Sequence, residues 1–175
     1  MSEARELRTP LRSEDIDSLN VGDMVLISGD VLAGRDAVLP KICNLIDSNS
    51  LESLAGHLQG SVVFHTAVSP AGIGPTSSNK VEIEGSFDKL SSVGVRMHLG
   101  KGSISSDTVA LLDRRHACFA VIPPVTALLG EKTHSSEVLA FPELGMEALH
   151  LLEVDRFPVI IAAVNGRSIF DEQNN

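Results

Sequence analysis

The chain has 175 residues, a formal net charge of −9 and a hydrophobic share of 43%. This is enough for one buried core and short for two ordinary domains, so residues 1–175 are predicted to form a single domain. An acidic chain without a Lys/Arg block cannot replace phosphate counterions, which argues against a nucleic-acid partner. The apolar runs are far shorter than the roughly 20 residues that cross a bilayer, so no membrane contact is expected.

The two cysteines, Cys43 and Cys118, each lie in an apolar stretch. Such thiols are typical of a reducing compartment, and the charged first residues resemble no secretory signal, so a cytoplasmic protein is expected. Two separated cysteines are too few for an iron–sulfur cluster, and no Cys-x-x-Cys or His-x-x-x-His spacing occurs. The sequence therefore predicts no metal site in this chain.

The first half of the chain predicts a strand, a helix, a second strand and a long loop. Residues 24–29 form a β-branched run that ends at glycine, and residues 36–48 carry apolar side chains at helical spacing. Pro40 is compatible with this helix only within its first turn. A strand at residues 61–66 leads into residues 67–80, which are so rich in Gly, Pro and Ser that no regular element is expected there.

The second half continues the alternation. Strands are predicted at residues 95–99 and 118–122, separated by a helix from about 104 to 116 with Ser103 or Ser105 as its N-cap.

The C-terminal region predicts two more strands, at residues 149–154 and 158–164, joined by residues 155–157. A short connection of this kind favours antiparallel pairing, so the sheet is expected to be mixed. The whole pattern indicates a layered α/β domain.

Arg35 lies in the first of three glycine-bounded segments that suit a carboxylate. It follows Gly34 and precedes the predicted helix, so its planar guanidinium and the helix N–H groups could face one anion. The alternative is that Asp36 is a plain N-cap and Arg35 is solvated.

The second segment is the loop GIGPTSSNK at residues 72–80. Its glycines and proline fix a path that lets backbone N–H groups face inward, and the hydroxyls of Thr76 and Ser77 and the cation of Lys80 follow. It is not a dinucleotide fingerprint, because that pattern needs glycine where Ser77 stands. The loop either binds an anionic, hydroxylated ligand or is a purely structural connection.

The third segment is Gly100-Lys101-Gly102-Ser103, between a predicted strand and a helix. Glycines on both sides let the backbone approach a ligand closely while the ammonium of Lys101 supplies a point charge. It is not a P-loop, because the glycine spacing differs. All three segments lie near the C-terminal ends of strands, where ligands bind in α/β sheets. The six scattered histidines are expected to be structural, although His65 and His98 lie on strands that lead into these loops.

Several motifs together resemble one family. They are LRTPL, VGDMVLISGDVLAGRDA, GIGPTSSNK, LGKGS and ELGMEALHLLEVDRFPVIIAAVNG, in that order. The chain resembles, from about residue 7 to residue 170, the β subunit of class I (iron–sulfur) fumarase and L-tartrate dehydratase, equivalent to the C-terminal domain of class I fumarase. The resemblance implies a swivelling β/β/α layered domain with a mixed sheet.

The resemblance also implies a function. The chain would be the β subunit of a hydro-lyase that removes water from a small dicarboxylic 2-hydroxy acid, in an αβ hetero-oligomer whose α subunit holds a [4Fe–4S] cluster. By position, Thr76 would take part in proton transfer, and Arg35 and Lys101 would bind substrate carboxylates. Lys80 stands where the family usually has arginine, and Gly74 and Ser77 complete the expected substrate-binding set.

Three positions depart from the family pattern: Lys80, Leu39 in place of a histidine, and Pro123-Pro124 in a stretch that is commonly rich in Gly and Ala. A lysine keeps the charge of arginine but loses its bidentate fork, which puts the identity of the substrate in question. The alternative function is a non-catalytic binding or assembly subunit that retains a residual dicarboxylate site.

Overall fold

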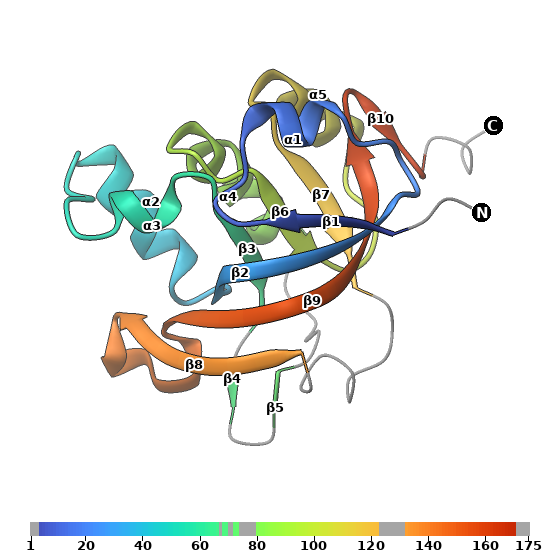
Figure 1. Ribbon diagram of the computed structural model, residues 1–175. Helices are drawn as coiled ribbons and strands as arrows, with labels where there is room; N and C mark the ends of the chain where they lie inside the picture. The colour runs from blue at the N-terminus through green and yellow to red at the C-terminus, as the bar shows by residue number, and fades with distance from the viewer. Residues whose placement is uncertain (1–3, 67, 70–71, 74–79, 123–131, 171–175) are drawn as a thin grey trace.

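The computed structural model of the chain describes residues 4–66, 68–69, 72–73, 80–122 and 132–170 (Figure 1). The described elements in chain order are β1 (Arg5–Arg8), α1 (Ser13–Asp17), β2 (Met24–Gly34), α2 (Leu39–Asp47), α3 (Ala55–Leu58), β3 (Val62–His65), β4 (Val68–Ser69), β5 (Gly72–Ile73), α4 (Lys80–Ser92), β6 (Met97–Gly100), α5 (Ser106–Arg114), β7 (Cys118–Val121), β8 (Thr133–Ala140), the 3₁₀ helix η1 (Pro142–Glu147), β9 (Leu149–Val164) and β10 (Arg167–Ser168).

Five strands form a ring. β2, β3, β6 and β7 are neighbours in that order and run parallel. β9 runs antiparallel to β7 on one side and to β2 on the other, which closes the sheet on itself. β1 extends the sheet along β2, and β8 and β10 pair with β9. The sheet of eight strands is therefore mixed, as the sequence predicted.

The ring has an apolar interior and a helix-covered exterior. Side chains such as Phe64, Met97 and Ile161 point into the interior, where Ile16 of α1 joins them. Because successive side chains of a strand alternate between its faces, the neighbouring residues of these strands point outward. There they pack against α2, α3, α4 and α5 in two further clusters. The layers are thus strand, strand and helix.

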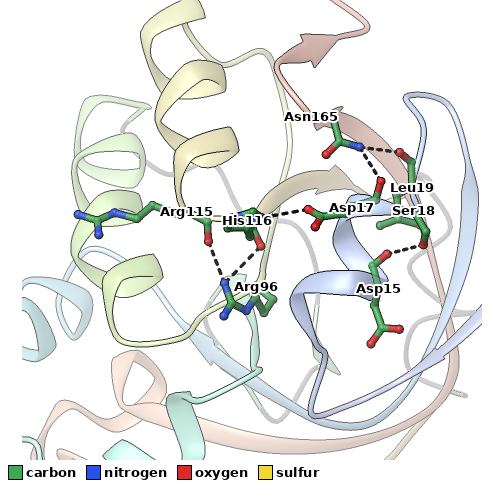
Figure 2. A network of polar contacts seen from close by, with 8 residues as sticks. All are labelled: Asp15, Asp17, Ser18, Leu19, Arg96, Arg115, His116 and Asn165. Atoms are coloured by element: carbon green, nitrogen blue, oxygen red, sulfur yellow. Dashed lines mark hydrogen bonds and ion pairs between the residues drawn. The ribbon is translucent and has the colours of Figure 1, made fainter.

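Polar contacts connect the residues just before β6 and β7 with α1 and with the end of β9 (Figure 2). His116 Nδ1 lies 3.1 Å from Asp17 Oδ1, and Arg96 Nη1 donates to the carbonyl oxygen of Arg115 at 2.8 Å. Asn165 donates to the carbonyl oxygens of Asp17 and Leu19 at 3.1 and 3.0 Å. This polar network stabilises the edge of the ring at which β6 and β7 begin.

Several elements confirm the sequence predictions. Pro40 lies in the first turn of α2, where its missing N–H leaves no hydrogen bond unmade. The N-cap of α5 is Ser105, whose side chain accepts a hydrogen bond from the backbone N–H of Thr108. Cys43 and Cys118 are both buried free thiols.

Three predictions about strands were wrong. Residues 149–164 form the single strand β9, and the expected connection at residues 155–157 is a bulge within it, where Arg156 has φ = 54°. β2 continues past Gly29 to Gly34, because its second half pairs with β3 and β9. Within residues 67–80, β4 and β5 form a two-residue ladder, too short to leave a pattern in the sequence.

Among the described residues, the helices are too short and too polar to span a membrane.

Candidate functional site

The carboxyl ends of β2, β3, β6 and β7 meet at one edge of the ring. Gly34 is the register partner of His65, Phe64 is the partner of Leu99, and Gly100 is the partner of Val121. The next residue along β2 is Arg35, and the next along β6 is Lys101. Since adjacent strands lie about 4.8 Å apart, the backbones of Arg35 and Lys101 are separated by roughly 10 Å at this edge.

Gly34 allows α2 to pack directly against the end of β2. A Cβ atom at this position would lie 2.7 Å from Val38 Cγ1 and 3.4 Å from Leu149 Cδ1. Only glycine fits that approach without displacing its neighbours. The backbone then turns, and the carbonyl oxygen of Arg35 accepts hydrogen bonds from the N–H groups of Val38 and Leu39. The side chain of Arg35 is thereby held at the start of a fixed turn.

Arg35 is paired with Glu147, the last residue of η1. Its Nε donates to Glu147 Oε1 at 2.7 Å, and its Nη2 contacts the same oxygen. The side chains of both residues are about one quarter exposed, at 26% and 25%. The hydrogen bond that Arg35 donates to Glu147 raises the pKa of Arg35, against the opposing effect of burial, so the guanidinium carries its full charge here.

This arrangement contradicts the alternative in which Asp36 is an N-cap and Arg35 is solvated. The N-cap position of α2 is occupied by Val38, which makes no side-chain cap. Glu147 was not among the predicted site residues. Its signal in the sequence is the ELGMEA segment, which was recognised as a family motif without a physical role.

Lys101 follows Gly100 at the end of β6, and its side chain is exposed. Gly102 has φ = +82°, a left-handed conformation that glycine adopts without strain, so the chain turns sharply after the lysine. A Cβ at Gly100 would lie 3.3 Å from the ring of Phe119, which limits the residue before the lysine as well. Lys101 thus lies at a constrained turn on the same edge as Arg35.

The remaining predicted site residues are only partly within the described structure. Gly74, Thr76 and Ser77 lie outside the described residues, as do Pro123 and Pro124. Lys80 is the first residue of α4, and nothing is described of its side chain.

Leu39, which replaces the histidine of the family pattern, is 3% exposed and packs in an apolar cluster that includes Leu149. The side chain at position 39 is therefore part of the hydrophobic core.

A buried polar chain runs from the carboxyl edge to α4. His65 Nε2 lies 3.3 Å from His98 Nδ1, and His98 Nε2 lies 2.9 Å from Ser91 Oγ. His65 and His98 are 2% and 0% exposed. Burial lowers the pKa of His65 to about 3, and burial and the neighbouring His65 lower the pKa of His98 well below its ordinary value. Both rings are neutral at neutral pH, which fits the structural role expected for them.

The cysteines belong to different elements: Cys43 lies on α2 and Cys118 on β7. Burial raises the pKa of both thiols, which disfavours the thiolate that binds iron. Among the described residues, no three or more His, Cys, Asp or Glu side chains gather into a possible metal site. The described side chains therefore do not fit an iron–sulfur cluster.

These features define an α/β domain with two cationic residues, Arg35 and Lys101, at the carboxyl edge of its parallel strands. The chain belongs to the family described as Fumarase C-terminus, which it matches over residues 2–173. This confirms the resemblance found in the sequence.

Individual relatives agree with this membership. A protein of Methanocaldococcus jannaschii that bears the provisional name L(+)-tartrate dehydratase subunit beta is 30% identical, over 94% of this chain and 90% of its own length. The L(+)-tartrate dehydratase subunit beta of Escherichia coli K12 is 25% identical, over 91% of this chain and 82% of its own. The anaerobic class I fumarate hydratase of E. coli K12 is 27% identical over 96% of this chain, which corresponds to 32% of that longer protein.

Proposed function

We propose that this chain is the β subunit of a hydro-lyase that reversibly eliminates water from a small dicarboxylic 2-hydroxy acid. The reaction would be of the fumarate hydratase or L-tartrate dehydratase type. Family membership supports the reaction class, and the names of the relatives support both substrates.

The observation that carries the proposal is the position of two cations at one edge. The parallel register of β2, β3 and β6 brings the residues after Gly34 and Gly100 to the same side of the ring. A dicarboxylate needs two positively charged contacts to fix both of its ends, and orientation of this kind lowers the entropic part of the barrier. Arg35 offers a planar fork and Lys101 a point charge, which suits two carboxylates in different orientations.

In this proposal, the loop before α4 completes the site. Gly74 and Ser77 contribute backbone and hydroxyl contacts, Lys80 holds the distal carboxylate, and Thr76 takes part in proton transfer. The support for these four roles is the match of the loop sequence to the family motif. An unperturbed threonine is a very poor base, so Thr76 needs a neighbouring charged group to activate it.

The Lewis acid for the leaving hydroxyl is assigned to a [4Fe–4S] cluster on a partner α subunit. The described residues of this chain offer no ligand set for the cluster. In this proposal, the chain binds and orients the carboxylates and moves the proton. We place the αβ complex in the cytoplasm, because the two free buried thiols of this chain are compatible with a reducing compartment.

The test is anaerobic purification of the tagged chain from its source cells. We expect a second subunit to co-purify with iron and sulfide, and the complex to interconvert malate and fumarate or to dehydrate tartrate. The chain alone should be inactive. A complex with an intact cluster that turns over no C4 hydroxy acid, yet binds one, would instead support a non-catalytic binding subunit. Turnover by the chain alone would contradict the division of labour.

A further inference from the structure

The pairing of Arg35 with Glu147 follows from the register of two strands that are distant in sequence. Ala33 of β2 is the antiparallel partner of His150 of β9. Residues after 33 therefore run beside residues before 150. This places the last residue of η1 next to the residue that follows β2. The contact is thus built into the ring, and it joins the ELGMEA motif to the carboxyl edge.

The contact fixes which edge of the guanidinium faces Glu147. Two donors of Arg35, Nε and Nη2, meet the single oxygen Oε1 of Glu147. One bond would fix only the position of Nε, whereas two neighbouring contacts hold the whole Nε–Nη2 edge toward the carboxylate of Glu147. A long arginine side chain otherwise loses rotational freedom when it binds a ligand, and a side chain that is already ordered avoids that loss.

The pairing involves one side of the guanidinium. An arginine has five N–H donors, and the Nε–Nη2 side that faces Glu147 accounts for one of its two bidentate faces. The other face is formed by Nη1 and Nη2, and it has the geometry that a carboxylate accepts through two parallel hydrogen bonds. Glu147 therefore contacts Arg35 through the Nε–Nη2 face.

We infer that Glu147 is a positioning residue, which holds the Arg35 guanidinium in the orientation that receives a substrate carboxylate. This inference rests on the proposed function, and it deepens it by assigning a role to the glutamate of the ELGMEA motif. Glu147 acts through Arg35 and has no contact of its own with the substrate, because two carboxylates would repel one another.

The experiment is a double-mutant cycle in the reconstituted αβ complex. Glu147→Ala should raise KM for the C4 dicarboxylate about tenfold and leave kcat within about threefold, because an oriented contact is lost in both the bound and the transition state. Glu147→Gln keeps an oxygen acceptor and should lie between the wild type and the alanine variant. In an Arg35→Ala background, Glu147→Ala should change KM by less than about twofold.

A matched control is available on the helices. Arg115 and Asp88 form the same kind of pair, Nε to Oδ1 at 2.8 Å, between the C-cap of α5 and α4. Asp88→Ala should leave KM unchanged. If Glu147→Ala costs as much without Arg35 as with it, or leaves KM of the wild-type background unchanged, Glu147 does not act through Arg35 and the inference is wrong.

A second readout separates this inference from the proposed function. In the full chain, without substrate, the Nε–H of Arg35 should exchange slowly with water by NMR and should exchange fast in Glu147→Ala. If the wild-type complex turns over no C4 hydroxy acid, the function fails while this measurement still decides whether Glu147 orders Arg35. Fast exchange in both proteins would contradict the positioning role whatever the enzyme does.

Discussion

The ring of Phe87 stacks on the ring of His98, with centroids 4.2 Å apart and planes inclined by 22°. Phe87 belongs to α4 and His98 to β6, so the contact seals the imidazole between helix and sheet. Ser91 of the same helix contacts one ring nitrogen of His98, and His65 contacts the other. The pair of histidines is therefore held in a site that favours the neutral form of both rings.

This burial predicts acid sensitivity. The pKa of His65 is about 3 in the folded chain, against an ordinary value of 6.5, and that of His98 is also lowered. The unfolded chain thus binds more protons, so the stabilisation is complete above pH 6.5 and is lost as the pH falls toward 3. By pH 4.5 the loss from His65 alone should reach roughly 2–3 kcal/mol, and His98 should add to it in the same direction. Urea unfolding between pH 8 and 4.5 measures it.

The matching comparison uses glutamine variants. The double variant His65→Gln/His98→Gln should have a shallower fall of unfolding free energy with acid than the wild type. His57 is exposed on α3, so His57→Gln should keep the wild-type profile. Equal slopes in the wild type and the double variant would show that the buried pair does not control acid stability.

Lys101→Ala should lower kcat/KM of the αβ complex roughly tenfold to more than a hundredfold. The reason is the loss of a charge-assisted contact of about 1.5–3 kcal/mol with a substrate carboxylate. Steady-state assays measure this. Lys89, an exposed lysine of α4 that pairs with Asp47 at 2.6 Å, supplies the control. An unchanged kcat/KM in Lys101→Ala would assign the Gly-Lys-Gly segment a structural role.

The variant Lys80→Arg tests whether position 80 selects the substrate. Under one hypothesis, Lys80 binds a distal substrate group that differs from the one bound by the family arginine. In that case, arginine at position 80 should change the order of preference among C4 dicarboxylates, because its fork prefers a planar carboxylate. Relative kcat/KM values for malate, fumarate and the tartrate isomers measure this. A uniform rise for all substrates, with their order kept, would mean that position 80 does not select the substrate.

Thr76→Val removes a hydroxyl while nearly keeping the side-chain shape. If Thr76 takes part in proton transfer, kcat should fall on the order of 10²–10⁴-fold, with little change in the midpoint of thermal unfolding. Single-turnover and steady-state rates of the assembled complex measure this. A variant complex that assembles normally with near-native kcat would remove Thr76 from the mechanism and leave the subunit as a carboxylate clamp.

The sequence predicted the parts of the fold that depend on local pattern. The strand that begins at Met24, the helix with Pro40 in its first turn and a serine cap before α5 all follow from periodicity and from backbone chemistry. Closure of the ring could not be predicted, since it depends on β9 pairing with β2, whose residues are more than 100 positions away. The bulge at Arg156 could not be predicted for the same reason, because β9 pairs with β2 both before and after it.

For the candidate site too, the sequence predicted only what depends on local pattern. Glycine spacing located Arg35 and Lys101 at strand ends, and the register places them on one edge. The partner of Arg35 is a long-range contact, so no local pattern indicated Glu147. The apolar environment of Leu39 was likewise visible only in three dimensions.

The order of the strands along the chain has a consequence for synthesis on the ribosome. β9 is the antiparallel partner of both β2 and β7, yet it is made after both of them. A nascent chain that has reached only β8 holds two open strand edges and an apolar ring interior that still faces water. Open edges of this kind pair readily with other chains. The emergence of residues 149–164 therefore ends the period in which this chain most needs protection from aggregation.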